Sequence, residues 1–340
     1  MVHCFKTSLV GRQIVVSTDP DVNHFIFQQE GKLVQSYHGF LHKYLRNLIL
    51  NLFGSESLKT KHVSEIEELT SKHLQLWSCQ QPSVELKQAI STMIYDFTVR
   101  KLFSFLGCYS AFLDGLISFP LNSPGPAYCK CLQGHKDFLD VVLEEMNKAG
   151  TILSEQTALD LLFALPFAAF ESASSAVVLA LQYLQSNPLA QVELTQEHET
   201  ILRERETKDS GITWKEYKSM TVTHMVNETI RLGNIVPAIF RKVVKDIEIK
   251  DYKIPAGWII LACTLAGREL NAGSKFFMGF GSVVRLCAGA EFVKLQISIF
   301  LHHLVTNYRL TVIKEGKAVG QPGLVFPDGF HVQILNKKFI

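Results

Sequence analysis

The sequence shows no excess of charge of one sign and no block of like charges. Its 34 lysines and arginines stand against 32 aspartates and glutamates, which gives a formal net charge of +2 and a pI near 8.1. Proteins that bind nucleic acids through phosphate groups concentrate basic residues on one surface or in one segment. The even mixture of charges therefore gives no support to a nucleic-acid partner.

Long apolar runs are missing from the start of the chain. Residues 1–30 contain no apolar segment long enough for a signal peptide or a membrane anchor, so we expect no N-terminal targeting segment. Seven cysteines, an odd number spread over 340 residues, do not form the pattern of a disulfide framework, and they favour a reducing compartment. No internal repeat or low-complexity segment is present.

What the chain does have is apolar material for a large core, because 47% of its residues are hydrophobic. Apolar residues at helical spacing predict helices over 20–27, 40–53, 60–77, 86–106, 158–184, 213–232 and 288–304. Alternating patterns predict strands over 10–16, 243–249, 252–261, 308–313 and 325–335. The turn-forming residues within 107–131 predict a loop. The expected fold class is mainly α with small β-sheets.

The segment 158–184 is the longest apolar one. Asp160, Pro166 and Glu171 argue against a lipid-facing span and favour a buried central helix. A carboxylate buried without a partner is costly, so Glu171 and its neighbour Ser172 are candidates for a functional pair. A membrane-associated interaction protein that uses this segment remains an alternative hypothesis.

A helix that begins after Thr213 carries a second charged pair. Thr213 and Glu216 have the spacing of a capping box, which predicts one helix as far as Leu232. Glu228 and Arg231 lie three residues apart on that helix, where side chains share a face and can form an ion pair. Such pairs are common surface features, so this pair alone indicates no function.

Residues 276–293, FFMGFGSVVRLCAGAEFV, place Cys287 in a glycine-dotted loop that leads into an apolar helix. Backbone N–H groups at a helix N-terminus and the nearby Arg285 are expected to lower the pKa of the thiol. Cysteine acts as a metal ligand or a nucleophile as the thiolate, so the setting predicts a reactive or metal-binding sulfur.

Taken in chain order, these motifs resemble those of the cytochrome P-450 family of haem-thiolate monooxygenases. The order is an apolar helix with an acid–alcohol pair, then Glu-x-x-Arg, then Phe-Gly-x-x-x-Arg-x-Cys-x-Gly before a final helix. The stretches DPDVNHFIFQQEGKLVQS and LCAGAEF are similar to the plant sterol- and triterpenoid-oxidising branch. The resemblance implies a single haem-monooxygenase-like domain over residues 1–340, without the family's N-terminal membrane anchor and incomplete inside.

The resemblance assigns roles around haem b. Cys287 matches the axial thiolate ligand of the haem iron, Phe280 the ring packed beside it, and Gly289 the backbone that comes close to the sulfur. Arg285 and Arg46 match residues that pair with the haem propionates. His42 stands where the family usually has the tryptophan of Trp-x-x-x-Arg.

The resemblance also assigns residues to oxygen and substrate. Glu171 and Ser172 match the acid–alcohol pair that delivers protons to bound dioxygen, with serine where threonine is common. Val236, Ala238 and Ile239 match a stretch that lines the substrate site, and their apolar character suits a lipid-like substrate.

The sequence departs from the family pattern in the loop before Cys287 and between Ala266 and Ser274. Val283 replaces a glycine, and a β-branched residue is poorly suited to positive φ, so we expect strain there. The element with the family's Pro-x-Arg-Phe-like motif is not found between Ala266 and Ser274, so Glu228 and Arg231 are expected to lack a third partner. Further internal joins are expected at 36–38, after Cys108 and at 132–134.

By resemblance, the expected function is an NADPH- and O2-dependent hydroxylation of a hydrophobic sterol or triterpenoid. Electrons would come from NADPH–cytochrome P-450 reductase, and the place of action would be the cytosolic face of the endoplasmic reticulum membrane. The alternative hypothesis is a truncated, catalytically inactive family member with weak or no haem binding.

Overall fold

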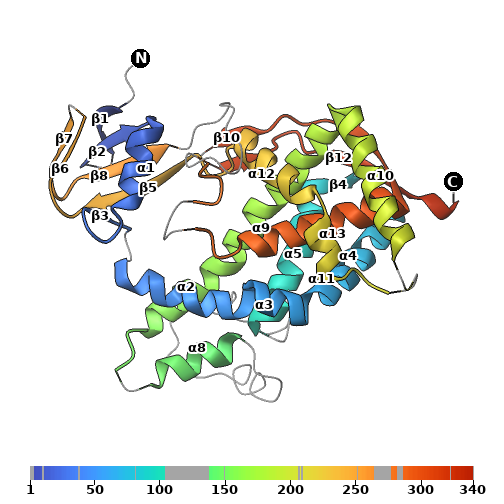
Figure 1. Ribbon diagram of the computed structural model, residues 1–340, viewed down its shortest axis with the longest axis horizontal. Helices are drawn as coiled ribbons and strands as arrows, with labels where there is room; N and C mark the ends of the chain where they lie inside the picture. Colours follow the sequence, from blue (N-terminus) through green and yellow to red (C-terminus); the bar gives the residue numbers. More distant parts are fainter. Residues whose placement is uncertain are drawn as a thin grey trace.

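The computed structural model describes residues 4–9, 11–36, 39–80, 82–103, 138–148, 150–205, 207, 210–250, 252–263, 277–281, 286–321 and 323–339. These residues form a large helical body and a smaller part rich in strands at one end of it (Figure 1). The expected class, mainly α with small sheets, is confirmed. Residues 107–131, the joins expected after Cys108 and at 132–134, and the interval from Ala266 to Ser274 lie outside the described residues.

The helices follow the chain in the order used for the labels of Figure 1. They are α1 (Pro20–Gln28), α2 (Gly39–Phe53), α3 (Ser55–Ser57), α4 (Val63–Ser78), α5 (Leu86–Phe103), α8 (Phe138–Met146), α9 (Glu155–Gln185), α10 (Pro188–Glu204), α11 (Trp214–Ser219), α12 (Val222–Gly233) and α13 (Ala290–Asn307). A π-helical turn, η1 (Leu58–His62), precedes α4, and a 3₁₀ turn, η3 (Lys337–Phe339), ends the described chain.

The strands in the described part of the chain form four small sheets. Their bounds are β1 (Cys4–Leu9), β2 (Arg12–Ser17), β3 (Val34–Gln35), β4 (Val84–Glu85), β5 (Ala238–Val243), β6 (Ile247–Ile249), β7 (Tyr252–Ile254), β8 (Ile259–Cys263), β9 (Tyr308–Lys314), β10 (Val319–Gln321), β11 (Gly323–Val325) and β12 (His331–Asn336). The largest sheet has the order β1-β2-β8-β5-β3, and β4-β12-β9, β10-β11 and β6-β7 are separate.

Two local signals in the sequence form the caps that they predict. Asp19 accepts hydrogen bonds from the backbone N–H groups of Asp21 and Val22, and Pro20 begins α1. Both halves of the capping box between Thr213 and Glu216 are also present. Short-range pairing decides these helix starts, so the sequence alone is enough to find them.

The helix predicted from Thr213 to Leu232 is wrong as one element, because the structure has α11 and α12 there. Met220 is extended between them, and the Glu197 carboxylate accepts hydrogen bonds from the N–H and the hydroxyl of Thr221 at 2.6 and 2.5 Å. Glu197 lies on α10, so a contact from another helix stabilises the interruption between α11 and α12. The end of α12 at Gly233, followed by Asn234 at φ 45°, is as the sequence indicates.

The strand predicted over 243–249 is also wrong in its bounds. β5 begins at Ala238 and pairs antiparallel with β8, while β6 and β7 form the hairpin around Lys250. The buried ion pair between Arg241 and Glu30, at 2.8 Å, joins β5 to the end of α1. Pairing with β8 therefore sets where β5 starts, which no local pattern around Ala238 indicates.

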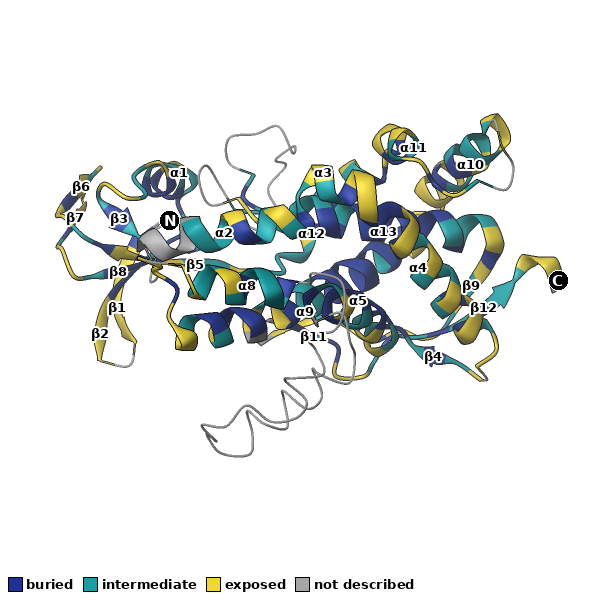
Figure 2. Ribbon diagram, turned by 90° about the horizontal axis from the view of Figure 1, so that it is seen from below, coloured by how far each residue is buried: buried dark blue, intermediate teal, exposed yellow. Residues whose placement is uncertain are grey.

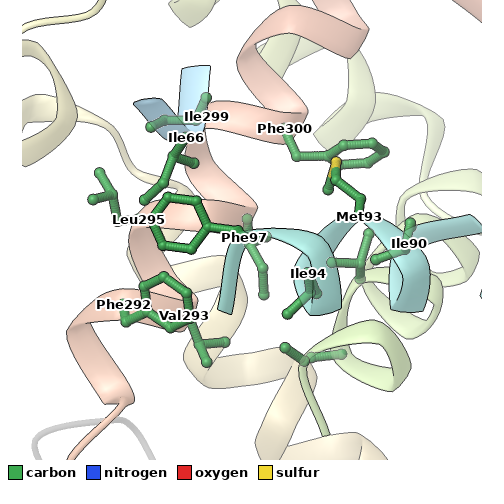
Figure 3. Close-up of a cluster of buried hydrophobic side chains, with 14 of the residues drawn as sticks. Ile66, Ile90, Met93, Ile94, Phe97, Phe292, Val293, Leu295, Ile299 and Phe300 are labelled. Carbon is green, nitrogen blue, oxygen red and sulfur yellow. The ribbon is translucent and has the colours of Figure 1, made fainter. Parts of the chain in front are cut away.

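The main core lies where α4, α5 and α13 meet (Figure 3). Phe97 of α5 stacks on Phe292 of α13 with ring centroids 5.4 Å apart, and Phe292 also contacts Phe53 at 4.8 Å. Leu295 and Phe300 continue the apolar face of α13 and are fully buried. α13 is thus fixed along its length by aromatic and aliphatic contacts.

α9 crosses the helical body beside α5 and α12 (Figures 1 and 2). Among the described residues, it is the one helix long and apolar enough to cross a membrane, and about half of its most apolar stretch (53%) is buried inside the protein. Ser174, Ala176 and Val178 lie in the continuous buried run 173–181 of this helix. The prediction of a buried central helix is therefore confirmed for residues 173–181.

Candidate functional site

The N-terminal end of α13 carries Cys287. Its N–H donates a hydrogen bond to the carbonyl of Phe280 at 2.7 Å, and Gly281, at φ +82°, donates to Met278 at 2.9 Å. The Phe280 ring packs against the main core and lies 5.1 Å below the ammonium of Lys294. The bond from Gly281 closes a tight turn at 278–281, and the bond from Cys287 places the exposed Cys287 side chain next to this segment.

Gly289 supplies the nearest backbone donor to the sulfur. It is the N-cap of α13, and its N–H donates a hydrogen bond to the Cys287 Sγ. A Cβ at this position would lie 3.9 Å from that sulfur, which is ordinary van der Waals contact. The structure therefore places the Gly289 backbone beside the sulfur, as expected, but the space itself does not demand glycine.

The expected lowering of the Cys287 pKa is wrong, because the structure shows a raised pKa. Although the side chain reaches solvent, protein atoms on its other sides displace water, and this desolvation raises the pKa of the thiol. The hydrogen bond from Gly289 and the positive charge of Arg46 lower it only in part. Arg285, which was expected to act here, and Val283 lie outside the described residues.

Arg46 joins α2 to the cysteine loop. Its guanidinium donates a hydrogen bond to the carbonyl of Leu286, the residue before Cys287. Helical spacing on α2 placed Arg46 and His42 on one face, and α2 forms over the predicted range. The side chain of His42 lies outside the described part of the chain, so its role stays a prediction.

One face of α9 carries small residues that remain accessible. Ala164 and Ala168 are exposed and Ser172 is half-buried, at successive four-residue steps. The Ser172 hydroxyl donates to the carbonyl of Ala168 at 2.7 Å, so this face combines a hydroxyl with open backbone surface. α9 also packs against α12 and α13, the helix whose first turn follows Cys287 (Figure 1).

Glu171 has a partner that the sequence patterns did not indicate. The ammonium of Lys87, in the first turn of α5, lies 2.7 Å from Glu171 Oε1 and also donates to the carbonyl of Leu324 at 3.1 Å. The hydroxyls of Ser174 and Ser175 donate to the Glu171 carbonyl. Lys87 and Glu171 are 84 positions apart, and no local motif signals their contact.

Glu228 and Arg231 form the predicted pair on α12. Arg231 donates from Nε and Nη2 to the same carboxylate oxygen, Glu228 Oε2, at 2.8 and 2.7 Å. Glu228 also borders a cleft of about 460 Å³ between the end of α9, the start of α10 and α12. Neither Cys287 nor Glu171 lines this cleft. The absence of a third partner stays a prediction, because that interval is not described.

The three residues expected near substrate occupy different surroundings. Val236 is half exposed before β5, and Ala238 begins that strand. Ile239 points to the opposite face of the strand from Ala238 and packs against a small cluster of Phe27, Ala262 and Met278. Ile239 thus contributes a core contact.

Comparison with known proteins gives a consistent result. The sequence model of the family described as Cytochrome P450 matches residues 27–269. The chain is 41% identical to Cytochrome P450 87A3 of Oryza sativa subsp. japonica, over 98% of the chain and 79% of that protein. It is 36% identical to Cucurbitadienol 11-hydroxylase of Siraitia grosvenorii, over 98% of the chain and 85% of that protein.

Solved structures show the same fold. The structure of retinoic acid-bound cyanobacterial CYP120A1 matches with a TM-score of 0.77 at 17% identity, over 98% of the chain and 92% of that structure. The alignment with the rice protein spans 405 positions, against 340 residues in the whole chain, so that relative carries residues with no counterpart here. The chain belongs to the cytochrome P450 family of haem-thiolate monooxygenases.

Proposed function

We propose that this chain uses O2 and electrons from NADPH to hydroxylate a sterol or triterpenoid. NADPH–cytochrome P450 reductase would supply the electrons. The observation that carries the proposal is the exposed Cys287 at the start of α13, in a chain similar to Cucurbitadienol 11-hydroxylase and, at 33% identity, to Beta-amyrin 16-alpha-hydroxylase CYP87D16 of Maesa lanceolata.

The residues present fit haem b at this place. Cys287 offers one accessible sulfur, which would serve as the protein ligand of a haem iron. Ala164 and Ala168 leave backbone of α9 accessible, and the haem would lie against this part of the helix. Arg46 supplies a cation next to the cysteine loop for an anionic substituent.

Each of these residues has a separate task in the proposal. Cys287 would ligate the iron, and the bound haem would supply the chemistry that activates dioxygen. The Gly289 N–H would stabilise the sulfur as an anion, and Phe280 would shield it from water. Arg46, with Arg285 and His42, would hold the propionates.

Glu171 and Ser172 would handle protons on the other side of the site. Ser172 lies on the accessible face of α9, and Glu171 lies next to it at the edge of that face. A carboxylate and a hydroxyl on adjacent residues can take a proton from solvent and pass it inward. Side chains that remain exposed, such as Phe167 and Val236, supply apolar contact for a sterol-like skeleton.

We propose the cytosolic face of the endoplasmic reticulum membrane as the site of action, by analogy with the family. Fluorescence of the tagged chain in plant cells, followed by carbonate extraction of the membranes, tests this placement. A uniform distribution through the cytosol would contradict it.

The absorbance spectrum of the reduced, purified protein under carbon monoxide tests the haem site. We expect a red-shifted Soret band in the wild-type protein and none in Cys287→Ala. Turnover with reductase, NADPH and 18O2 then tests the reaction on cucurbitadienol, β-amyrin and cholesterol. A folded protein without haem absorbance would favour the truncated, inactive form of the family, and a thiolate spectrum without labelled product would reject these substrates.

A further inference from the structure

We propose that Lys87 is a positioning residue for Glu171 and that it fixes which carboxylate oxygen is available for proton transfer. This inference rests on the proposed role of Glu171. The Lys87 ammonium contacts Glu171 Oε1 at 2.7 Å, and within the described residues no other hydrogen bond to this carboxylate is found. Oε2 is therefore the oxygen left to exchange a proton.

Lys87 lies where a cation needs a negatively charged or polar partner. Lys87 lies in the first turn of α5, where the positive end of the helix dipole disfavours a cation. Its ammonium is stabilised by the Glu171 carboxylate and by the carbonyl of Leu324, and the Phe326 ring lies 5.9 Å away. The lysine side chain is only 16% exposed and that of Glu171 is 38% exposed, so water screens this pair less than it screens a surface pair.

The backbone of Glu171 is held as well as its side chain. Ser174 and Ser175 donate to its carbonyl at 3.2 and 3.0 Å, and Ser172 donates to the carbonyl of Ala168. The carboxylate would otherwise sample several rotamers, because it lies at the accessible edge of α9. Lys87 selects the rotamer in which the carboxylate points toward α5 and β11.

Chemical cross-linking tests the geometry without haem or turnover. A water-soluble carbodiimide joins an amine and a carboxyl group in direct contact through an amide bond. We expect the peptides of Lys87 and Glu171 to be linked in the folded protein and not in urea, as seen by mass spectrometry. Lys87→Arg removes the reactive amine and is the control. Absence of the link from folded wild-type protein would overturn the inference.

Coupling of electrons to product tests the role. The measured quantity is hydroxylated product per NADPH consumed, on whichever of the three probe compounds is turned over. A general acid–base group typically contributes about 10²–10⁴-fold to the reaction rate. Because Lys87→Met leaves Glu171 in place and only releases its side chain, we expect a smaller effect, a drop in coupling of about tenfold. Lys87→Arg, which keeps the charge, should retain more than about half of the wild-type coupling.

Lys101 offers a matched control on the same helix. It forms an ion pair with Glu65 at 2.5 Å, has similar burial and lies near the Phe97 ring, but its partner is on α4. Lys101→Met should give wild-type coupling, with the same haem content and melting temperature as Lys87→Met. Equal coupling in both methionine variants would overturn the inference.

Glu171→Gln separates the two hypotheses. If it loses coupling while Lys87→Met does not, the proposed role of Glu171 stands and that of Lys87 fails. If Glu171→Gln matches the wild type, the proton-handling role itself fails, and the inference about Lys87 fails with it. If none of the probes is turned over, the proposed substrates are rejected, and the cross-link still decides whether Lys87 clamps Glu171.

Discussion

The middle of α13 and its N-terminal end are held in different ways. Phe300 and Leu295 are fully buried among side chains of neighbouring helices (Figure 3), whereas Cys287 is exposed and is held by backbone hydrogen bonds and by Arg46 nearby. The same helix thus belongs to the core over most of its length and to the site at one end. Stability therefore depends on the core, and the chemistry of the site can change without loss of the fold.

The largest effect is expected from Phe300→Ala. It removes a fully buried ring whose centroid lies 6.3 Å from that of the Trp77 ring. Such truncations lower the free energy of unfolding by about 3–5 kcal/mol. Urea unfolding of the haem-free protein measures this change. Phe167→Ala, at a ring that is 55% exposed on α9, is the control and should change stability little. Equal losses in both variants would contradict the division between core and site.

Acid should weaken the contact between α10 and α13. His198 and His302 are buried with their Nδ1 atoms 2.8 Å apart. Burial, followed by the charges of His198, His303 and Arg205, lowers the pKa of His302 from 6.5 to about 3, and burial also lowers the pKa of His198. The unfolded chain therefore binds more protons than the folded one below about pH 6.5, and stability falls as the pH drops through this window.

Urea unfolding at about pH 7 and about pH 5.5 measures that loss, above the range in which carboxylates titrate. His302→Gln should reduce the difference between the two pH values. His303→Gln, at the neighbouring imidazole 3.1 Å from Glu67, controls for removing a histidine from α13. An unchanged pH dependence in His302→Gln would show that the buried pair does not set it.

A smaller loss is expected at the start of α11. Thr213→Ala removes the side-chain cap on the Glu216 N–H, and lost caps cost about 0.5–2 kcal/mol. The matched control is Thr195→Ala, because that hydroxyl bonds the carbonyl of Gln191 inside α10 and caps nothing. Chemical denaturation should separate the two variants, and a larger loss at Thr195 would contradict the capping argument.

The smallest change in stability is expected from Cys287→Ala. The Cys287 side chain is exposed, and substitutions at exposed positions usually alter the free energy of unfolding by less than about 0.5 kcal/mol. Haem-free wild type and variant should unfold at the same urea concentration, as should Cys79→Ala, at another exposed cysteine. A loss above about 2 kcal/mol would show that the cysteine loop stabilises the core.

Local pairing explains what could be predicted from the sequence. The cap at Asp19, the capping box at Thr213 and the long apolar segment of α9 depend on neighbours within a few residues, so these elements form as expected. The ordered motifs also identified the family, which the comparisons confirm. The assigned roles of Glu171 and Cys287 stay predictions.

The remaining features depend on contacts between distant segments. Glu197 on α10 accepts a hydrogen bond from the Thr221 N–H and so interrupts the predicted helix there. Lys87 reaches Glu171 across 84 positions. The pKa of Cys287 rises because protein atoms from distant segments displace part of the water around its sulfur, which a sequence pattern does not report. Helix α10 carries the first of these contacts, and the patterns did not single it out.

α13 also has a mechanical consequence for the site. At about 1.5 Å per residue, the ten steps from Ala290 to Phe300 make a rigid segment of about 15 Å, whose far end is fixed in the core. A tilt of about 4° at Phe300 moves the start of the helix, and Cys287 with it, by about 1 Å. Misplacement on that scale can cost about 10²-fold in rate. A conservative substitution deep in the core can therefore impair catalysis while every residue of the site is intact.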